Sequence, residues 1–154
     1  MPPRPPADGR TDLTVDENIP EHPGADSIYP RFSRAYATLD VDLLADLYAE
    51  DAVYVTPDGV LKRGRAEIRA GFAQFFGRTS RNAERMEIRF RVLTRRVTGD
   101  TVTDVGLFTL DRFRGEEQLA RDVGKFVTVA SPGPDGTWRF DLDSYSMVNQ
   151  GDPE

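Results

Sequence analysis

The stretch KFVTVASPGPDGTWRFDLDSYS, residues 125–146, decides the fold that this sequence predicts. Two runs of alternating residues flank a turn-rich loop at 131–137, which is the pattern of an antiparallel β-hairpin. Centring the loop on Pro134 places Lys125 opposite Asp143, and residues that pair across two strands share one face of the sheet. The predicted apolar face carries Phe126, Trp138, Phe140 and Leu142. The predicted charged face carries Lys125, Val127, Asp141, Asp143 and Tyr145.

Length and charge narrow the classes of function. The 154 residues suffice for one domain with its own core, and the net charge of −6 does not favour nucleic acid as a partner. No run of about 18 apolar residues predicts a transmembrane helix, and the proline-rich opening lacks the apolar core of a secretory signal. We therefore expect a cytoplasmic protein that binds neither nucleic acid nor a membrane.

The inventory of reactive side chains is short. The chain has no cysteine and a single histidine, His22, which lies in a segment rich in Pro, Gly and acidic residues. Thiolate chemistry, Ser-His-Asp triads and multi-histidine metal sites are thereby excluded, and acid–base chemistry falls to Asp, Glu, Lys or Tyr. We expect no metal and no cofactor. Lysine occurs only at Lys62 and Lys125, whereas arginines are numerous. This rarity argues against Lys125 as an ordinary solvent-exposed charge.

Composition and periodicity divide the chain. Residues 1–27 hold six prolines and few large apolar groups, which predicts a disordered tail, with a lid or partner-binding arm as the alternative. Residues 28–150 form the predicted domain, and 151–154 a short tail. Helical spacing predicts three helices, at 28–39, from Asp42, and at 65–76 with a stop at Gly77.

After about Arg85 the apolar period changes from 3.6 to 2. Helices followed by long antiparallel strands predict an α+β fold whose helices cover one face of the sheet. Gly106 and Gly124 lie inside long strands and predict bends that curl the sheet and leave a cavity. Asp104 and Asp122 are expected on the outward face. The predicted strands are 52–56, 60–62, 86–92, 101–113, 119–130 and 137–148.

Three segments carry a family resemblance. LYAEDAVY at 47–54 resembles a helix-to-strand joint, GRAEI at 64–68 a helix start, and GKFVTV at 124–129 with DGTWR at 135–139 a last hairpin. All three are similar to the SnoaL-like, SgcJ/EcaC-type branch of the nuclear transport factor 2-like superfamily, over about residues 28–150. The resemblance implies a curved, mostly antiparallel sheet wrapped around three helices as a cone with an internal pocket. Its members include isomerases, cyclases, epoxide hydrolases, binding modules and oligomerisation domains.

The resemblance to the ketosteroid isomerases of this superfamily is incomplete. Those enzymes use a carboxylate base after the first strand, and the matching position here is Thr56, which cannot serve as that base. Their helix-one tyrosine matches Tyr36, whereas their strand acid falls near Gly124 and Lys125.

Two other chemistries of the superfamily stay open. Relatives of limonene-epoxide hydrolase activate water with two Asp and one Arg, and the candidates are Asp143, Asp111 or Asp141, and Arg121 or Arg112. A SnoaL-type cyclase needs one carboxylate near an enolisable polyketide, and Asp143 is the candidate.

The predicted catalytic group is Asp143 with Lys125 and Tyr36. Asp143 would act as general base or activate water, Lys125 would hold it ionised or stabilise an enolate, and Tyr36 would donate from the first helix. The alternative is an ordinary Lys125–Asp143 ion pair, with the aromatic residues in core packing. The predicted ligand contacts are Tyr48, Tyr54, Thr56, Phe72, Phe76, Thr109, Asp111 and Tyr145.

These observations predict a cofactor-independent cyclase, isomerase or hydrolase for a small hydrophobic molecule of the polyketide or terpenoid kind. The alternatives are a non-catalytic binding protein with the same pocket and a homodimerisation module with a filled cone. We also predict a homodimer through the outer face of the sheet, because an apolar stripe there would be too apolar to leave in water; the competing arrangement packs that stripe against the helices. The stripe consists of Phe108, Leu110, Phe126, Trp138 and Phe140.

Overall fold

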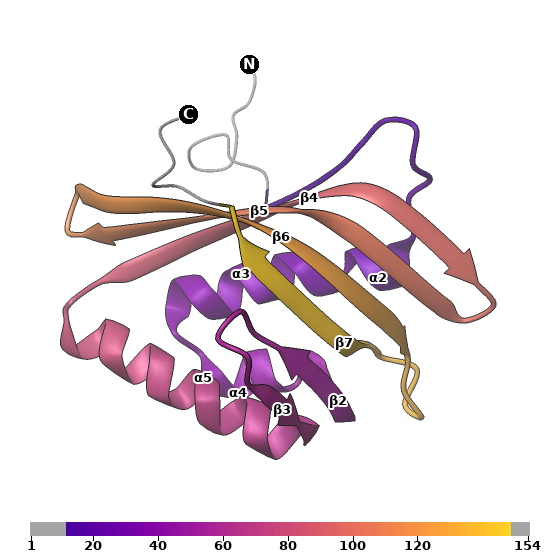
Figure 1. Cartoon of the computed structure of the whole chain (residues 1–154), viewed down its shortest axis with the longest axis horizontal. Coiled ribbons are helices and arrows are strands. Elements are labelled where there is room, and N and C mark those ends of the chain that lie inside the picture. Colours follow the sequence, from indigo (N-terminus) through magenta and orange to yellow (C-terminus); the bar gives the residue numbers. More distant parts are fainter. Residues whose placement is uncertain (1–11, 149–154) are drawn as a thin grey trace.

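The sheet of this protein is curved, and most of its helical structure lies on the concave side (Figure 1). The computed structural model describes residues 12–148. The strands are β1 (Leu13–Val15), β2 (Tyr48–Val55), β3 (Leu61–Arg63), β4 (Arg85–Thr98), β5 (Thr101–Arg114), β6 (Glu117–Pro132) and β7 (Trp138–Met147). The helices are α2 (Pro23–Asp26), α3 (Ile28–Thr38), α4 (Val41–Ala45) and α5 (Gly64–Arg81).

The seven strands form one mixed sheet in the order β1-β4-β5-β6-β7-β2-β3. Strands β4 to β7 make an antiparallel meander, whereas β1 pairs with β4 and β2 pairs with β7 in parallel. Helix α3 packs against β4, and α5 packs against α4 and β2. The predicted α+β fold, a curved and mostly antiparallel sheet around three helices, is confirmed.

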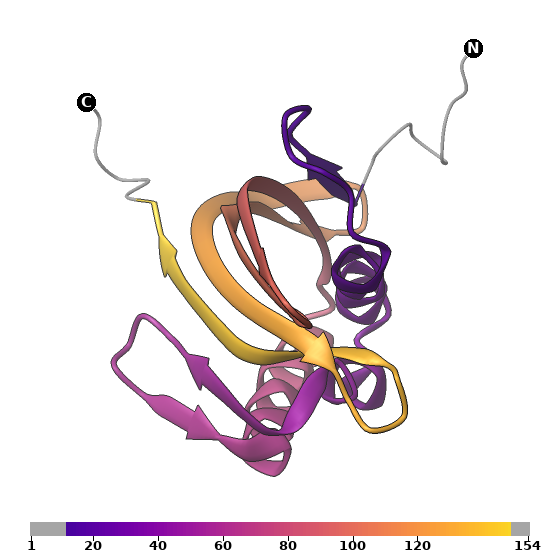
Figure 2. The ribbon, with the colours of Figure 1, turned by 90° about the vertical axis from the view of Figure 1, so that its right-hand side faces the viewer.

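Gly124 and Gly106, inside the long strands, leave room for aromatic rings of the neighbouring strands to lie over them. A Cβ on Gly124 would lie 2.2 Å from the ring of Phe108, and one on Gly106 would lie 2.8 Å from the ring of Phe126. The register of β4 and β5 shifts beside Gly106, between Val92 and Thr94, and such bulges increase local bending. Figure 2 shows the resulting curvature around the helices.

Helix α5 is longer than the sequence predicted. It continues through Gly77 to Arg81, so the predicted stop at Gly77 is wrong. The helical spacing of buried residues extends to Thr79, and the helix ends just before Ala83, which adopts a left-handed φ of 58°.

The hairpin of β6 and β7 has a different register from the predicted one. Lys125 pairs with Ser146 rather than with Asp143, a shift of three positions (146 − 143 = 3), and Asp143 pairs with Thr128. A bulge at Asp141 contributes to the shift, because Val129 pairs with Leu142 while Ala130 pairs with Phe140. Since an odd shift moves side chains to the other face, the predicted grouping of Lys125 with Asp143 is wrong.

The apolar stripe faces the helices. Phe108, Phe126 and Phe140 are buried in the core, and Trp138 is half-buried against His22 at 4.8 Å between ring centroids. The predicted outward placement of the stripe is therefore wrong, and the homodimer prediction loses the observation on which it rested.

The segment at 12–27 is folded onto the sheet, so the predicted disorder is wrong for these residues; residues 1–11 lie outside the described part. Strand β1 extends the sheet beside β4. Arg95, with a 1% exposed side chain, bonds to Asp26 of α2 at 2.6 Å and to Asp104 at 2.8 Å. Asp104 also accepts a hydrogen bond from Tyr29, so its predicted place on the outward face is wrong because this buried network holds it.

The predicted end of the domain at 150 and the short tail at 151–154 fall outside the described residues. Among residues 12–148, no helix combines the length and apolar character that crossing a membrane would require.

Candidate functional site

A cavity of about 740 Å³ opens between the concave face of the sheet and α3, α5 and the β2–β3 hairpin. Small-molecule sites commonly have volumes of this order and a mostly apolar lining with a few polar groups. Apolar and aromatic residues from every wall line it, including Phe32, Ile68, Phe72, Ile88, Phe108 and Phe126. Polar groups at its edge include Thr56, Asp58, Lys62, Arg78, Arg112 and Asp122.

Asp143 is the buried carboxylate of this cavity. It lies on β7, is 7% exposed, and its Oδ2 accepts a hydrogen bond of 2.6 Å from the hydroxyl of Tyr48. Burial raises the pKa of Asp143 to about 6, and the Tyr48 hydrogen bond opposes that shift. No cation within residues 12–148 forms an ion pair with Asp143, so its charge is not neutralised by a counter-charge there. A carboxylate with a pKa near neutrality is suited to general acid–base catalysis.

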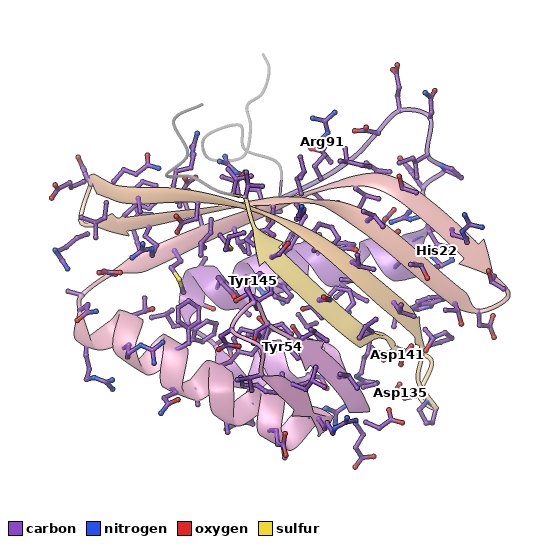
Figure 3. The ribbon with its side chains drawn as sticks, viewed as in Figure 1. His22, Tyr54, Arg91, Asp135, Asp141 and Tyr145 are labelled. Atoms are coloured by element: carbon purple, nitrogen blue, oxygen red, sulfur yellow. The ribbon has the colours of Figure 1, made fainter. Side chains whose placement is uncertain are left out.

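Three tyrosines contribute hydroxyl groups to the cavity near Asp143. Tyr36 comes from α3, Tyr54 from β2 and Tyr145 from β7, and the rings of Tyr54 and Tyr145 stack at 6.0 Å between the sheet and α5 (Figure 3). Burial raises the pKa of all three phenols, and the negative charge of Asp143 raises them further. The hydroxyls therefore stay protonated and act as hydrogen-bond donors.

Tyr36 differs from its neighbours in the use of its hydroxyl. Tyr48 donates to Asp143, and Tyr54 and Tyr145 bond to one another. The Tyr36 hydroxyl has no hydrogen-bond partner within residues 12–148, although its side chain is buried and lines the cavity. Buried hydroxyls nearly always have a hydrogen-bond partner, so we expect a bound ligand or a water molecule to bond to Tyr36.

The structure brings together most of the residues that the sequence predicted for the site. Those that line the cavity are Tyr36, Tyr54, Thr56, Phe72, Asp143 and Tyr145. Tyr48 lies behind Asp143 as its hydrogen-bond donor, and Phe76 packs in the core beside Phe72 rather than lining the cavity.

Three predicted residues point away from the cavity. Lys125 is exposed on the convex face because of the register shift, so it cannot hold Asp143 ionised, and this prediction is wrong. Thr109 and Asp111 alternate with the cavity-lining Leu110 and Arg112, which places both on the convex face. Their prediction as ligand contacts is therefore also wrong.

The predicted epoxide-hydrolase set is not assembled either. Asp111 is buried beneath Arg89 at 3.0 Å and Arg121 at 2.7 Å, on the face of the sheet opposite to Asp143. Asp141 accepts a hydrogen bond of 2.6 Å from Ser131.

Sequence reasoning missed several cavity residues. Tyr29 and Thr128 line the cavity and are joined by a hydrogen bond of 2.9 Å. Asp122 lines the cavity as well, so its predicted outward placement is wrong. Lys62 was noted only for its rarity, although its pairing with Tyr54 across β2 and β3 was a usable signal. Cross-strand partners point to the same side, so a prediction that placed Tyr54 in the cavity should have placed Lys62 there too.

Residues 30–139 match the family model of the SnoaL-like domain, which covers more than half of the chain. The chain belongs to the SnoaL-like domain family. No curated protein sequence matches it.

Solved structures agree with this SnoaL-like fold at low sequence identity. An NTF2-like protein with a cystatin-like fold from Novosphingobium aromaticivorans has a TM-score of 0.71 and 19% identity, covering 84% of this chain and 82% of that one. A protein from Catenulispora acidiphila, in complex with S-DNPA, has a TM-score of 0.70 and 17% identity, covering 80% and 90%. A ketosteroid isomerase-like protein from Erwinia carotovora atroseptica has a TM-score of 0.65 and 10% identity, covering 81% and 94%.

The SnoaL-like cavity thus combines one buried carboxylate with several phenolic donors and an apolar lining. Thr56 lines the cavity, and its hydroxyl bonds to Asp58. Within residues 12–148 no group of three or more His, Cys, Asp or Glu side chains is placed to hold a metal ion.

Proposed function

We propose that this SnoaL-like protein catalyses proton transfer on a small hydrophobic molecule, as an isomerase or cyclase with Asp143 as the general base. The observation that carries the proposal is Asp143 itself. It is a buried carboxylate, lacks a neutralising cation in the described part of the chain, faces a cavity of ligand size, and is held by Tyr48. A merely structural aspartate would more often be paired, because an unpaired buried carboxylate costs stability.

The proposed step is proton abstraction next to a carbonyl group. Tyr48 occupies Oδ2 of Asp143, so Oδ1 accepts the proton from the substrate carbon. The electron pair of the broken C–H bond moves toward the carbonyl oxygen, and the free hydroxyl of Tyr36 donates a hydrogen bond to the enolate that develops. In isomerisation Asp143 then returns the proton to another carbon. In cyclisation the enolate carbon attacks a second carbonyl, and Asp143 returns the proton to the alkoxide that forms.

The lining supports a polyketide- or terpenoid-like substrate. Phenyl and phenol rings from α3, α5 and the sheet provide flat apolar contacts that suit fused rings. The similar Catenulispora acidiphila protein was solved in complex with a small molecule, S-DNPA, which is consistent with a ligand in this type of cone.

A non-catalytic binding protein is the second candidate. By the resemblance to the ketosteroid isomerases, Thr56 matches the position of their base, so this chain has no carboxylate there. The same cavity would then hold a ligand without converting it. The open cavity of about 740 Å³ disfavours the third alternative, a dimerisation module with a filled cone.

The decisive experiment is hydrogen exchange at an enolisable substrate. The protein is incubated in deuterated water with a panel of cyclic aromatic ketones such as tetralone, and deuterium uptake is followed by mass spectrometry. We expect Asp143→Asn to lower the exchange rate by about 10²–10⁴-fold. The wild-type rate should rise as the pH increases through about 6, because only ionised Asp143 accepts the proton.

Asp141→Asn is the matched control, since it removes a carboxylate from the same strand that bonds to Ser131 and does not line the cavity. It should leave the rate unchanged. Ligand binding without exchange, or equal exchange by the wild type and Asp143→Asn, would favour the binding protein over the enzyme.

A further inference from the structure

Gly71 lies in the middle of α5, and its contact with Lys62 explains why a glycine stands there. Gly71 lies within a regular helix, where glycine is among the least favourable residues. A Cβ at this position would lie 2.8 Å from Cε and 3.3 Å from Cδ of Lys62. The absent side chain therefore leaves room for the Lys62 stem to pack against α5.

The direction of Lys62 follows from its strand pairing. Lys62 pairs with Tyr54 across β2 and β3, and Tyr54 lines the cavity. Because cross-strand partners point to the same side, Lys62 also points to the cavity and is half-buried at its wall. Lys125, the only other lysine of the chain, is exposed on the convex face.

The charges around Lys62 are unevenly compensated. Within residues 12–148, neither Lys62 nor Arg78, which lies two turns beyond Gly71 on α5, forms an ion pair. Arg78 lies 6.0 Å from the ring of Phe75 instead. Asp58 feels the charge of Lys62, but its carboxylate accepts hydrogen bonds from Thr56 and from the backbone of Val60.

The opposite wall is different. Arg112 of β5 also lines the cavity, but it lies 3.8 Å from Glu84 and 3.7 Å from Asp122. Lys62 and Arg78 therefore differ from Arg112 in having no carboxylate within ion-pair distance among residues 12–148. A cation attracts an anion more strongly where protein excludes water, and Lys62 is half-buried whereas Arg78 is exposed.

We infer that Lys62, supported by Arg78, recognises an anionic group of the ligand, so that the substrate class is an amphipathic organic acid with an apolar ring system. This inference rests on the proposed function, because it assigns the substrate of the same cavity. The ring system fills the aromatic interior, and a carboxylate of the ligand stays at the half-buried edge with Lys62. Tyr54 pairs with Lys62 on one side and with Asp143 on the other, so the anionic group and the reacting carbon of the ligand would lie on either side of Tyr54.

Two dyes that differ by one anionic group test this inference. Anilinonaphthalene sulfonate carries a sulfonate, whereas N-phenylnaphthylamine has the same rings without it. We expect Lys62→Met, which keeps the apolar stem, to weaken binding of the sulfonate dye about tenfold at low salt. Binding of the neutral dye should change less than about twofold. Arg81→Met, on the same helix but away from the cavity lining, is the control and should affect neither dye.

Gly71→Ala tests the contact between Gly71 and the Lys62 stem without removing a charge. The added Cβ collides with the Lys62 stem, so this variant should weaken the sulfonate dye as Lys62→Met does. In a Lys62→Met background it should add no further loss in affinity, because the misplaced ammonium is already gone.

Leu110→Trp shows where the dyes bind, since it fills part of the cavity and should weaken both. If Leu110→Trp weakens both dyes but Lys62→Met weakens neither, the inference about Lys62 is overturned and the cavity stands. Equal weakening of both dyes by Lys62→Met overturns it as well, because Lys62 would then act through shape alone. If Leu110→Trp affects neither dye, or neither dye binds, the ligand-binding function of the cavity fails together with the inference.

Discussion

At the scale of single residues, the site depends on a carboxylate held in an environment that disfavours its charge. Asp143 has one strong donor, Tyr48, and no cation among the described residues. Its burial makes it basic enough to accept a proton near neutral pH and also makes the native protein less stable whenever it is ionised. The same physical cause therefore links the proposed catalysis to a measurable loss of stability.

The stability prediction for Asp143 has a definite sign. Its pKa is raised from 3.8 to about 6 in the native state, so the native protein holds a proton that the unfolded chain releases between these values. Its contribution to stability is fully present below about pH 4 and is lost as the pH rises through about 6, by about 3 kcal/mol for a shift of this size. Asp143→Asn should raise the free energy of unfolding at pH 8 by up to about that amount and change it little at pH 4.

Urea unfolding at the two pH values measures this difference, with Asp141→Asn as the control. An equal effect of Asp143→Asn at both pH values would show that Asp143 is ionised in the native state throughout, contrary to the raised pKa.

At the scale of elements, the segment at 12–27 belongs to the fold through one buried arginine. Arg95 joins Asp26 of α2, Asp104 of β5 and the carbonyl of Pro20. Tyr29 then connects Asp104 to Thr128 on the cavity wall. Buried polar contacts thus hold this segment in place together with the apolar contacts of Leu13, Val15 and Ile19 and the pairing of β1 with β4.

We expect Arg95→Met to lower the free energy of unfolding by about 3–5 kcal/mol, because it leaves the buried carboxylate of Asp104 unpaired. Amide hydrogens of 12–27 should exchange faster in this variant. Arg91→Met is the control, since Arg91 tethers the same segment through Asp16 in a more exposed pair and should cost less than about 1 kcal/mol. Hydrogen exchange with mass spectrometry and urea unfolding measure both effects; similar costs for the two variants would contradict the buried network.

At the scale of the whole molecule, the face of the sheet that turns inward decides what the protein can bind. The concave face carries the aromatic rings together with Asp143 and Tyr145, so the core and the site share one surface. The convex face carries Lys125 and the ion pairs of Asp111 with Arg89 and Arg121. Because the apolar stripe is buried on the concave face, it no longer supports the homodimer, which stays a prediction.

Neighbouring residues of β6 test this assignment of faces. Phe126 is 4% exposed and Val127 is 38% exposed. We expect Phe126→Ala to lower the free energy of unfolding by about 3–5 kcal/mol, and Val127→Ala to lower it by less than about 1 kcal/mol. Urea unfolding measures both changes, and light scattering at several protein concentrations reports the oligomeric state. If Phe126→Ala changed the oligomeric state without loss of stability, the stripe would face outward and mediate the dimer, contrary to the structure.

Periodicity within the sequence determined the class of fold. The change from a 3.6-residue to a 2-residue period near Arg85 predicted helices followed by a long antiparallel meander, and Gly106 and Gly124 predicted bends, because both signals arise from neighbouring residues. The shortage of histidine and cysteine left Asp143 as the leading acid, and the structure places it in the cavity.

Only the tertiary structure decided which side chains meet. The bulge at Asp141 and the odd register shift depend on how two strands fit the whole sheet, and together they separated Lys125 from Asp143. Asp104 became a buried residue because Tyr29 and Arg95 reach it from distant elements. The Lys62 stem packs against α5 because Gly71, on another element, leaves room for it. Contacts of this kind join residues far apart in the chain, so no local pattern in the sequence contains them.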